Sequence, residues 1–269
     1  MGISQDLILL TLLVTFPFLG FTSADLQGKL QLENFQRTHN DTLSDLIFLL
    51  DTSGSLWYYD HSSRSMKVGF DDEKVFVNSL LSHIRVSLAA TRVSIVLFGT
   101  RATLDINYVT DLNINNHKCN FKKSFYALKF RSGLTNMHDA FQYAYDIIFG
   151  TLSGNKRPNA LAKTAVFLLT DGMWNAGGDP NNIAKTLKQN NIELFSIGVT
   201  NGINENVLKQ LATDDNHAFH YNSFTQFREL ANHLRGGNSD PQGYDTHQIS
   251  CIRKENVSRP FIVGSTRIN

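Results

Sequence analysis

Four short apolar runs, each separated from the next by a stretch with helical periodicity, constrain the fold more than any other feature. They lie at residues 45–50, 93–98, 165–169 and 194–199. None alternates apolar and polar side chains, and a short continuous apolar run is typical of a strand buried on both faces. Strands that alternate with helices predict parallel pairing through right-handed crossovers. We therefore expect an α/β fold, a doubly wound, mostly parallel sheet with helices on both faces.

The segments between these runs predict helices over 71–84, 137–148 and 204–211, one opened by Asp179 and Pro180, and a last one over 225–234, with a short strand at 217–221. Asp71, Asp72 and Glu73 fall in a first helical turn, where the helix dipole favours negative charge. Ligands of doubly wound sheets bind beyond the carboxyl ends of strands, where the strand order reverses. Functional residues are therefore expected at strand ends.

The two ends of the chain differ in texture from its middle. Residues 7–21 are almost wholly apolar and small residues follow, which predicts a signal peptide over 1–24. The run is shorter than the roughly 20 residues of a spanning helix, so we expect no membrane span after signal cleavage. Residues 25–43 are polar without clear periodicity and form a lead-in segment. The domain itself takes 44–235, and 236–269 has the composition of a linker-like tail.

A secreted chain allows a disulfide and glycans. The two cysteines, Cys119 and Cys251, permit one intrachain bridge, which would tie the tail to the domain. The alternative is that Cys119 is a buried free thiol and Cys251 pairs with another chain. Sequons at Asn40 and Asn256 predict glycosylation. A formal net charge of +1 without a basic run indicates no nucleic-acid partner.

Oxygen-bearing side chains gather where the predicted strands end. Asp51, Ser53 and Ser55 directly follow the first apolar run, Thr135 precedes the helix that begins near 137, and Asp171 ends another run. Alone, each is more often a turn or a helix cap. Mg²⁺ prefers hard oxygen ligands in octahedral geometry. Together the five side chains predict a metal site at one edge of the sheet.

These five residues, in this order, resemble the metal-ion-dependent adhesion site of von Willebrand factor type A domains, over residues 44–235. The resemblance implies that Ser53, Ser55 and Thr135 contact the ion directly and that Asp51 and Asp171 act partly through water. A Glu or Asp of a partner would complete the coordination. It also implies Mg²⁺, with Mn²⁺ or Ca²⁺ as alternatives.

The resemblance further implies a secreted protein of the extracellular matrix or of cell adhesion, whose ligand is a matrix protein or a cell-surface receptor. The alternative is a structural matrix scaffold, in which the metal only stabilises the fold.

The loop after the first metal-binding residues is longer than the family pattern and carries Trp57, Tyr58 and Tyr59, while Trp174 follows Asp171. Aromatic residues are enriched at binding hot spots, so we expect these four side chains to rim the metal face. The alternative is that Trp57 or Tyr58 packs on the sheet edge as core.

An enzyme is not expected. Ser53 and Ser55 have no base in their motif and no nucleophile-elbow pattern. The glycine patterns of phosphate and dinucleotide binding are also missing.

Overall fold

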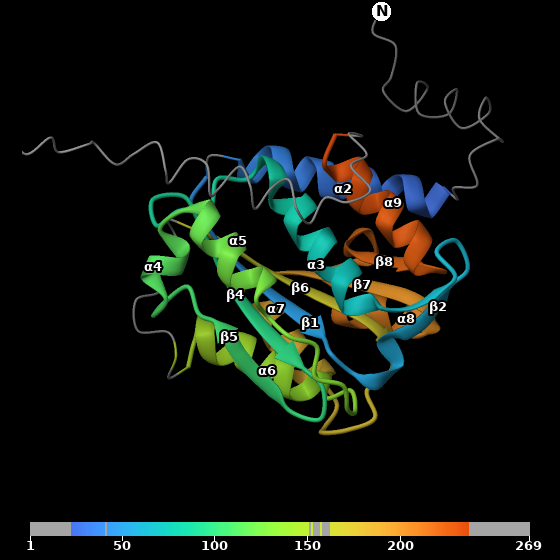
Figure 1. Cartoon of the computed structure of the whole chain (residues 1–269). Helices are drawn as coiled ribbons and strands as arrows, with labels where there is room; N and C mark the ends of the chain where they lie inside the picture. Colours follow the sequence, from blue (N-terminus) through green and yellow to red (C-terminus); the bar gives the residue numbers. More distant parts are fainter. Residues whose placement is uncertain (1–22, 41, 151, 153–156, 158–161, 237–269) are drawn as a thin grey trace, which may run out of the picture.

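The computed structural model describes residues 23–40, 42–150, 152, 157 and 162–236. A six-stranded sheet crosses its centre in the order β5-β4-β1-β6-β7-β8 (Figure 1). Its strands are β1 (Ser44–Asp51), β4 (Thr91–Phe98), β5 (Ala102–Ile106), β6 (Lys163–Gly172), β7 (Glu193–Gly202) and β8 (Ala218–Tyr221). All neighbours pair in parallel except β5, which runs antiparallel to β4. The predicted doubly wound α/β fold is confirmed.

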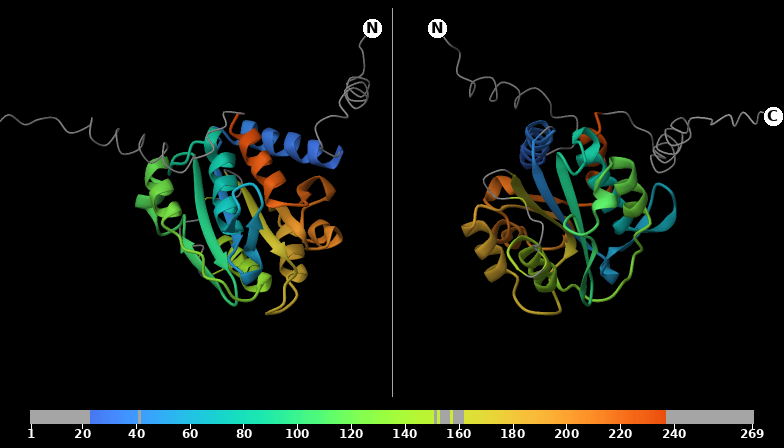
Figure 2. Two further views of the ribbon diagram at one scale, coloured as in Figure 1. Left: turned by 45° about the vertical axis from the view of Figure 1, so that its right-hand side comes forward. Right: turned by 90° about the vertical axis from the view of Figure 1, so that its left-hand side faces the viewer.

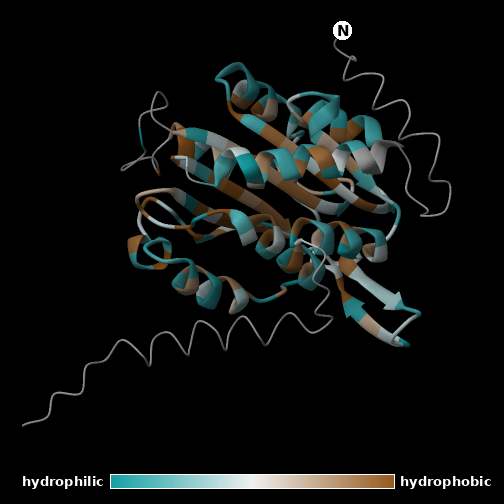
Figure 3. Cartoon of the chain, turned by 90° about the horizontal axis from the view of Figure 1, so that it is seen from above, coloured by the Kyte–Doolittle hydropathy of each residue, from teal (hydrophilic) through white to brown (hydrophobic). Residues whose placement is uncertain are grey.

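Two apolar layers form because successive side chains of each strand point to opposite faces of the sheet. Phe48 and Leu50 of β1 belong to one buried cluster, and Ile47 and Leu49 to the other. The helices over the first layer are α2 (Ser23–His39), α3 (Gly69–Leu80), α5 (Lys118–Tyr126) and α9 (Phe224–Leu234). The second layer is covered by α6 (Met137–Ile148), α7 (Asn181–Gln189) and α8 (Glu205–Leu211). Figure 2 shows helices on both sides of the sheet, and Figure 3 shows its strands as the most hydrophobic part of the molecule.

The remaining elements are short. A brief helix, α4 (Leu112–Asn115), precedes α5, and single 3-10 turns lie at Gly54–Leu56, Leu81–His83 and Asp215–His217. The long loop after the first predicted metal ligands is a hairpin of β2 (Trp57–Asp60) and β3 (Ser65–Val68), which pair antiparallel. The edge strand β5 and the hairpin carry no apolar run, so the sequence pattern did not predict them.

The strand order reverses between β1 and β6, because β4 and β5 lie on one side of β1 and β6, β7 and β8 on the other. A doubly wound sheet places its ligand site at the carboxyl ends of the strands on either side of this point. β1 ends on Asp51, and β6 carries Asp171 near its end. The pairing of β6 with β7 shifts register between Thr170 and Gly172, an irregularity that is common beside functional sites.

The predicted lead-in segment, residues 25–43, is helical up to His39, although its sequence shows no clear periodicity. In α2, Leu32 and Phe35 are buried, and the Phe35 ring lies 5.1 Å from that of Phe167 in an edge-on contact. Gln36 and His39 are also buried on this side of the helix. Polar residues thus share the buried stripe with apolar ones, and this mixture hid the helical period in the sequence.

We expect Gln36→Ala to lower the free energy of unfolding by about 1–3 kcal/mol, the usual result of leaving buried carbonyls without a donor. The Gln36 Nε2 donates to the carbonyl oxygens of Ser79 and Leu80, both at 2.9 Å, and of Leu234 at 3.2 Å. These bonds join α2 to the ends of α3 and α9. Urea denaturation measures the change, with the exposed Arg37→Ala as the control on the same helix. Equal stability of the two variants would contradict this role of Gln36.

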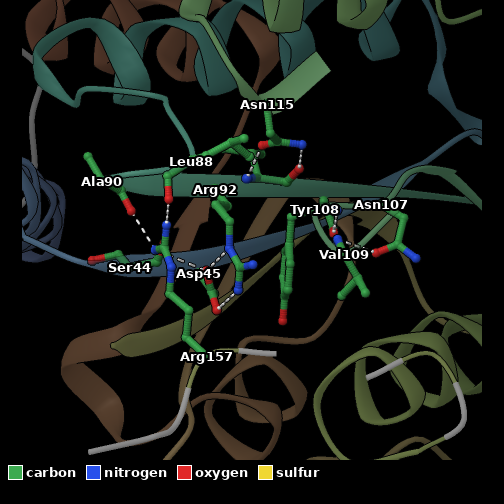
Figure 4. A network of polar contacts seen from close by, with 12 residues as sticks. Ser44, Asp45, Leu88, Ala90, Arg92, Asn107, Tyr108, Val109, Asn115 and Arg157 are labelled. Atoms are coloured by element: carbon green, nitrogen blue, oxygen red, sulfur yellow. Dashed lines mark hydrogen bonds and ion pairs between the residues drawn. The ribbon is translucent and has the colours of Figure 1, made fainter. Parts of the chain in front are cut away.

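A buried ion-pair network lies at the start of β1 (Figure 4). The Asp45 carboxylate, 1% exposed, accepts from Arg92 Nε at 2.8 Å and from Arg92 Nη2 at 2.6 Å. Arg157 Nη1 lies 3.4 Å from the same carboxylate and donates to the carbonyl oxygens of Ser44 and Ala90. The network joins β1, β4 and the segment that leads into β6.

Candidate metal centre

Four of the five predicted ligands are joined in one hydrogen-bonded chain. The backbone N–H of Ser53 donates to Asp51 Oδ1 at 2.7 Å, which folds the loop after β1 back over the strand end. The hydroxyls of Ser53 and Ser55 lie 2.9 Å apart. The Ser55 hydroxyl donates to Asp171 Oδ1 at 2.7 Å. Side chains from the ends of β1 and β6 therefore converge on one point, although 116 positions separate Ser55 from Asp171.

The fifth predicted ligand, Thr135, is buried in a loop that adjoins this point. The Gly54 N–H donates to the Gly133 carbonyl at 2.9 Å, which fixes the two loops to each other. Gly133 has φ +117°, and a Cβ there would lie 2.5 Å from Thr100 Oγ1, so only glycine fits. Asn175, just beyond Asp171, accepts from the Thr135 N–H and donates to the Thr135 carbonyl. Three loops thus meet at the carboxyl edge of the sheet.

Two residues that the sequence analysis did not assign to the site belong to its surroundings. Thr170 donates its hydroxyl to Asp51 Oδ2 at 2.7 Å, so both oxygens of Asp51 are bonded. Glu73 is 1% exposed, and its Oε2 has no hydrogen-bond partner among the described residues. From the sequence, only a favourable interaction of Glu73 with the helix dipole was expected, and its burial was not. Phe76 and Val77, three and four positions further on, mark the buried face of the helix, and this spacing was a signal for the burial of Glu73.

Negative charge is concentrated and poorly solvated here. Burial, reinforced by the charge of Asp171, raises the pKa of Asp51 to about 7. Burial also raises the pKa of Asp171. The pKa of Glu73 is raised well above its ordinary value by burial and then by the charges of Asp51 and Asp171. Each carboxylate opposes ionisation of the others, so a cation at this point would stabilise all three.

The donor set fits a hard divalent cation. Carboxylate and hydroxyl oxygens are the ligands that Mg²⁺ prefers, and few carboxylates leave the ion able to accept another anionic ligand. Across the part of the chain that the structure describes, no group of three or more His, Cys, Asp or Glu side chains is arranged to hold a metal. A cation at this edge would therefore depend on the hydroxyls of Ser53, Ser55 and Thr135 as well as on Asp51 and Asp171.

The four predicted rim residues take different places. Trp57 and Tyr59 are 51% and 50% exposed. Tyr58 is half-buried: its ring stacks on Phe224 at 4.5 Å, and its hydroxyl donates to Asp72. Trp174 is also half-buried and packs against the second apolar layer.

The predicted modification sites are placed only in part. Asn40 is exposed at the end of α2. Cys119 lies in α5, and no described cysteine is a free thiol. Residues 1–22 of the predicted signal peptide, Cys251 and Asn256 lie outside the described residues, so cleavage, the bridge and the glycans stay predictions. None of the described helices combines the length and apolar character needed to cross a membrane.

The fold and this donor set define a class of protein. The family model for the von Willebrand factor type A domain matches residues 45–233. The chain therefore belongs to the von Willebrand factor type A domain family.

Among individual proteins, the chain is 32% identical over 206 residues to the sushi, von Willebrand factor type A, EGF and pentraxin domain-containing protein 1 of Rattus norvegicus, covering 75% of this chain and 6% of that protein. Matrilin-2 of Mus musculus is 25% identical over 197 residues, which are 72% of this chain and 19% of matrilin-2. The chain thus spans only a small part of the length of these relatives.

Solved structures give the same fold. Proximal thread matrix protein 1 from the mussel byssus superposes with a TM-score of 0.61 at 26% identity, over 72% of this chain and 48% of that chain. Another structure of the mussel protein has zinc in its metal-ion-dependent adhesion site (MIDAS) motif. It superposes with a TM-score of 0.59 at 18% identity, over 79% of this chain and 46% of the mussel chain. Matrix proteins are therefore among the relatives of this chain.

Proposed function

We propose that this chain is an extracellular adhesion or matrix-assembly module that grips an acidic side chain of a partner protein through a divalent cation. The cation, Mg²⁺ in our proposal, is held by Asp51, Ser53, Ser55, Thr135 and Asp171. The contact that carries the proposal is the 2.7 Å hydrogen bond from the Ser55 hydroxyl to Asp171, which brings hydroxyl and carboxylate oxygens of two strand ends together. The zinc-occupied motif of the mussel relative supports a metal at this edge of the fold.

The residues around the proposed ion have different roles in holding it. When bound, the ion supplies positive charge that attracts a carboxylate of the partner. Ser53 and Ser55 offer neutral oxygens, which leave that charge largely uncompensated. Asp51 is held in place by the Ser53 N–H and the Thr170 hydroxyl, so its carboxylate is oriented before any ion arrives. Such preorganisation reduces the entropy lost on binding.

We expect Asp171→Asn to abolish Mg²⁺ binding and, with it, Mg²⁺-dependent retention of extracellular matrix proteins on the immobilised domain. The amide keeps the shape of the side chain but removes its negative charge. Isothermal titration with MgCl₂ and affinity capture with Mg²⁺ or EDTA measure the two effects, while circular dichroism checks the fold. Asp179→Asn is the matched control, because Asp179 is exposed and, among the described residues, accepts hydrogen bonds only from Asn181 at the start of α7. Retention that survives EDTA would remove the metal from the mechanism.

A scaffold whose metal serves only stability is the second candidate, favoured by the burial of Asp51 and Glu73 beneath the site. In that case Mg²⁺ raises the melting temperature but EDTA releases no partner. Parallel melting and capture experiments separate the two functions.

We further propose that the chain has no hydrolase activity. Ser53 and Ser55 bond to each other and to Asp171, and neither makes a hydrogen bond to a histidine within the described residues. A serine-directed fluorophosphonate is expected to leave both hydroxyls unlabelled, and labelling at either would contradict this.

A further inference from the structure

The β2–β3 hairpin has its apolar side chains on the face that points away from the domain. Trp57 and Tyr59 alternate along β2 with Tyr58 and Asp60, and the register places Tyr59 opposite Met66. Trp57, Tyr59 and Met66 are 51%, 50% and 58% exposed. The hairpin projects beyond the helices in Figure 2. A strand pair that only covers a core turns its apolar side chains toward that core, whereas this hairpin turns these three outward.

The opposite face of the hairpin is fixed to the domain. Tyr58 donates to Asp72 Oδ2 of α3 at 2.7 Å, and Arg228 of α9 donates to the Tyr58 hydroxyl and to Asp72. Lys67 Nζ and Asp60 Oδ2, on this same face, form an ion pair across the two strands at 2.5 Å. The exposed aromatic residues are therefore held on an anchored support. A rigid aromatic anchor binds with little loss of entropy.

The exposed face continues into a pocket. Phe130 packs edge-on against Trp57, with ring centres 5.7 Å apart, and also contacts Phe70 at 6.3 Å. Both phenylalanines line a pocket of about 480 Å³ together with Val68 and Leu128. A volume in this range suits an inserted apolar group.

This surface lies beside the metal centre. Trp57 is two residues after Ser55, so their Cα atoms are no more than about 7 Å apart. Leu134, next to Thr135, is 47% exposed. One partner segment of a few residues is therefore long enough to reach the ion and the hairpin at once.

The charges of this surface favour a partner segment that carries negative charge. Arg64 at the hairpin tip and Lys129 at the pocket are exposed, and neither has an ion pair within the described part of the chain. The acidic side chains nearby are paired, Asp60 with Lys67 and Asp71 with Lys74. The surface thus presents apolar area and unpaired positive charge.

We propose that the β2–β3 hairpin face (Trp57, Tyr59 and Met66) and the pocket beside it form the specificity surface for a protein segment whose metal-binding carboxylate is flanked by a bulky apolar side chain. This inference rests on the proposed function, because the carboxylate of the segment binds the cation. The apolar flank fills the hairpin face and the pocket, and additional acidic residues of the segment face Arg64 and Lys129.

The probe is a pair of displayed peptide libraries with a fixed central Glu or a fixed central Gln among random residues, selected on the immobilised full chain in Mg²⁺. We expect only the Glu library to be enriched, with Trp, Phe, Leu or Met within three positions of the Glu. Trp57→Ala and Met66→Ser should each weaken the selected peptides at least tenfold, while Mg²⁺ binding measured by titration stays unchanged. Leu30→Ser is the matched control, because Leu30 is an equally exposed apolar residue on helix α2, outside the hairpin and the pocket.

Two results would overturn the inference in distinguishable ways. If Glu peptides are retained in Mg²⁺ without an apolar flank, or bind the Trp57 and Met66 variants as tightly as the parent, the hairpin surface is wrong and the metal function stands. If no peptide depends on Mg²⁺, the proposed function fails and this inference fails with it. A dimer of the parent chain in sedimentation that Trp57→Ala dissociates would assign the hairpin face to a second copy and likewise contradict the proposal.

Discussion

In EDTA, the free energy of unfolding is expected to fall by roughly 4 kcal/mol, from Asp51 alone, as the pH rises from about 4 to about 7. The pKa of Asp51 is raised from its ordinary 3.8 to about 7, chiefly by burial and then by the charge of Asp171. The folded domain therefore retains a proton that the unfolded chain has lost, and this favours folding at low pH. That stability is lost as the pH rises through the window, at about 1.36 kcal/mol per pKa unit. Glu73 and Asp171, whose pKa values are also raised, act in the same direction.

Urea denaturation between pH 4 and pH 7 measures this loss, and Asp51→Asn isolates the contribution of Asp51. The amide cannot ionise, so the variant should lose less stability over the same window, and effects common to both proteins cancel. Saturating Mg²⁺ should restore the parent protein, because the ion stabilises the ionised carboxylates; at a hundred times Kd the gain is about 2.7 kcal/mol. Identical pH slopes for the parent and Asp51→Asn in EDTA would contradict the assignment.

Asp45→Ala is expected to lower the free energy of unfolding by about 3–5 kcal/mol, the usual effect of removing one partner from a buried ion pair. Asp45 is 1% exposed and receives two hydrogen bonds from Arg92, whose guanidinium also lies 4.7 Å from the Tyr108 ring centre. Alanine would leave that guanidinium, and the nearby one of Arg157, without their carboxylate (Figure 4). The cost is the burial of positive charge that has lost its carboxylate.

The matched control is Asp105→Ala, which removes the ion pair with Arg131. The Arg131 side chain is 41% exposed, so solvent screens the pair and the expected loss is about 0–1 kcal/mol. Urea denaturation at constant pH compares the two variants. Similar small losses in both would show that the buried network at the start of β1 does not stabilise the domain. Because Asp45 lies at the opposite end of β1 from Asp51, Mg²⁺ binding by the folded fraction should persist.

The four central strands, β4, β1, β6 and β7, were predictable because each contains an unbroken apolar run, and burial on both faces requires that composition. The convergence of the oxygen-bearing side chains was predictable for a related reason, since Asp51 and Asp171 lie at the ends of such runs and parallel strands end at one edge. The spacing of Phe76 and Val77 indicated a buried face of α3 at Glu73, but the sequence could not show that Glu73 lies beneath Asp51. Its burial depends on how α3 lies against β1.

The sequence by itself determined the α/β fold, the edge of the sheet where the oxygen-bearing side chains gather, and the chemistry of those side chains, because apolar runs and strand-end positions are local signals. Only the tertiary structure decided that α2 covers β6 and β7, that Glu73 lies beneath Asp51, and that Trp57 and Tyr59 point outward while Tyr58 anchors their hairpin. Those outcomes depend on contacts between segments far apart in the chain. Aromatic side chains alternate between the two faces of the hairpin, so the sequence allows either face to be buried. The bonds of Tyr58 with Asp72 and Arg228 turn the Tyr58 face toward the domain.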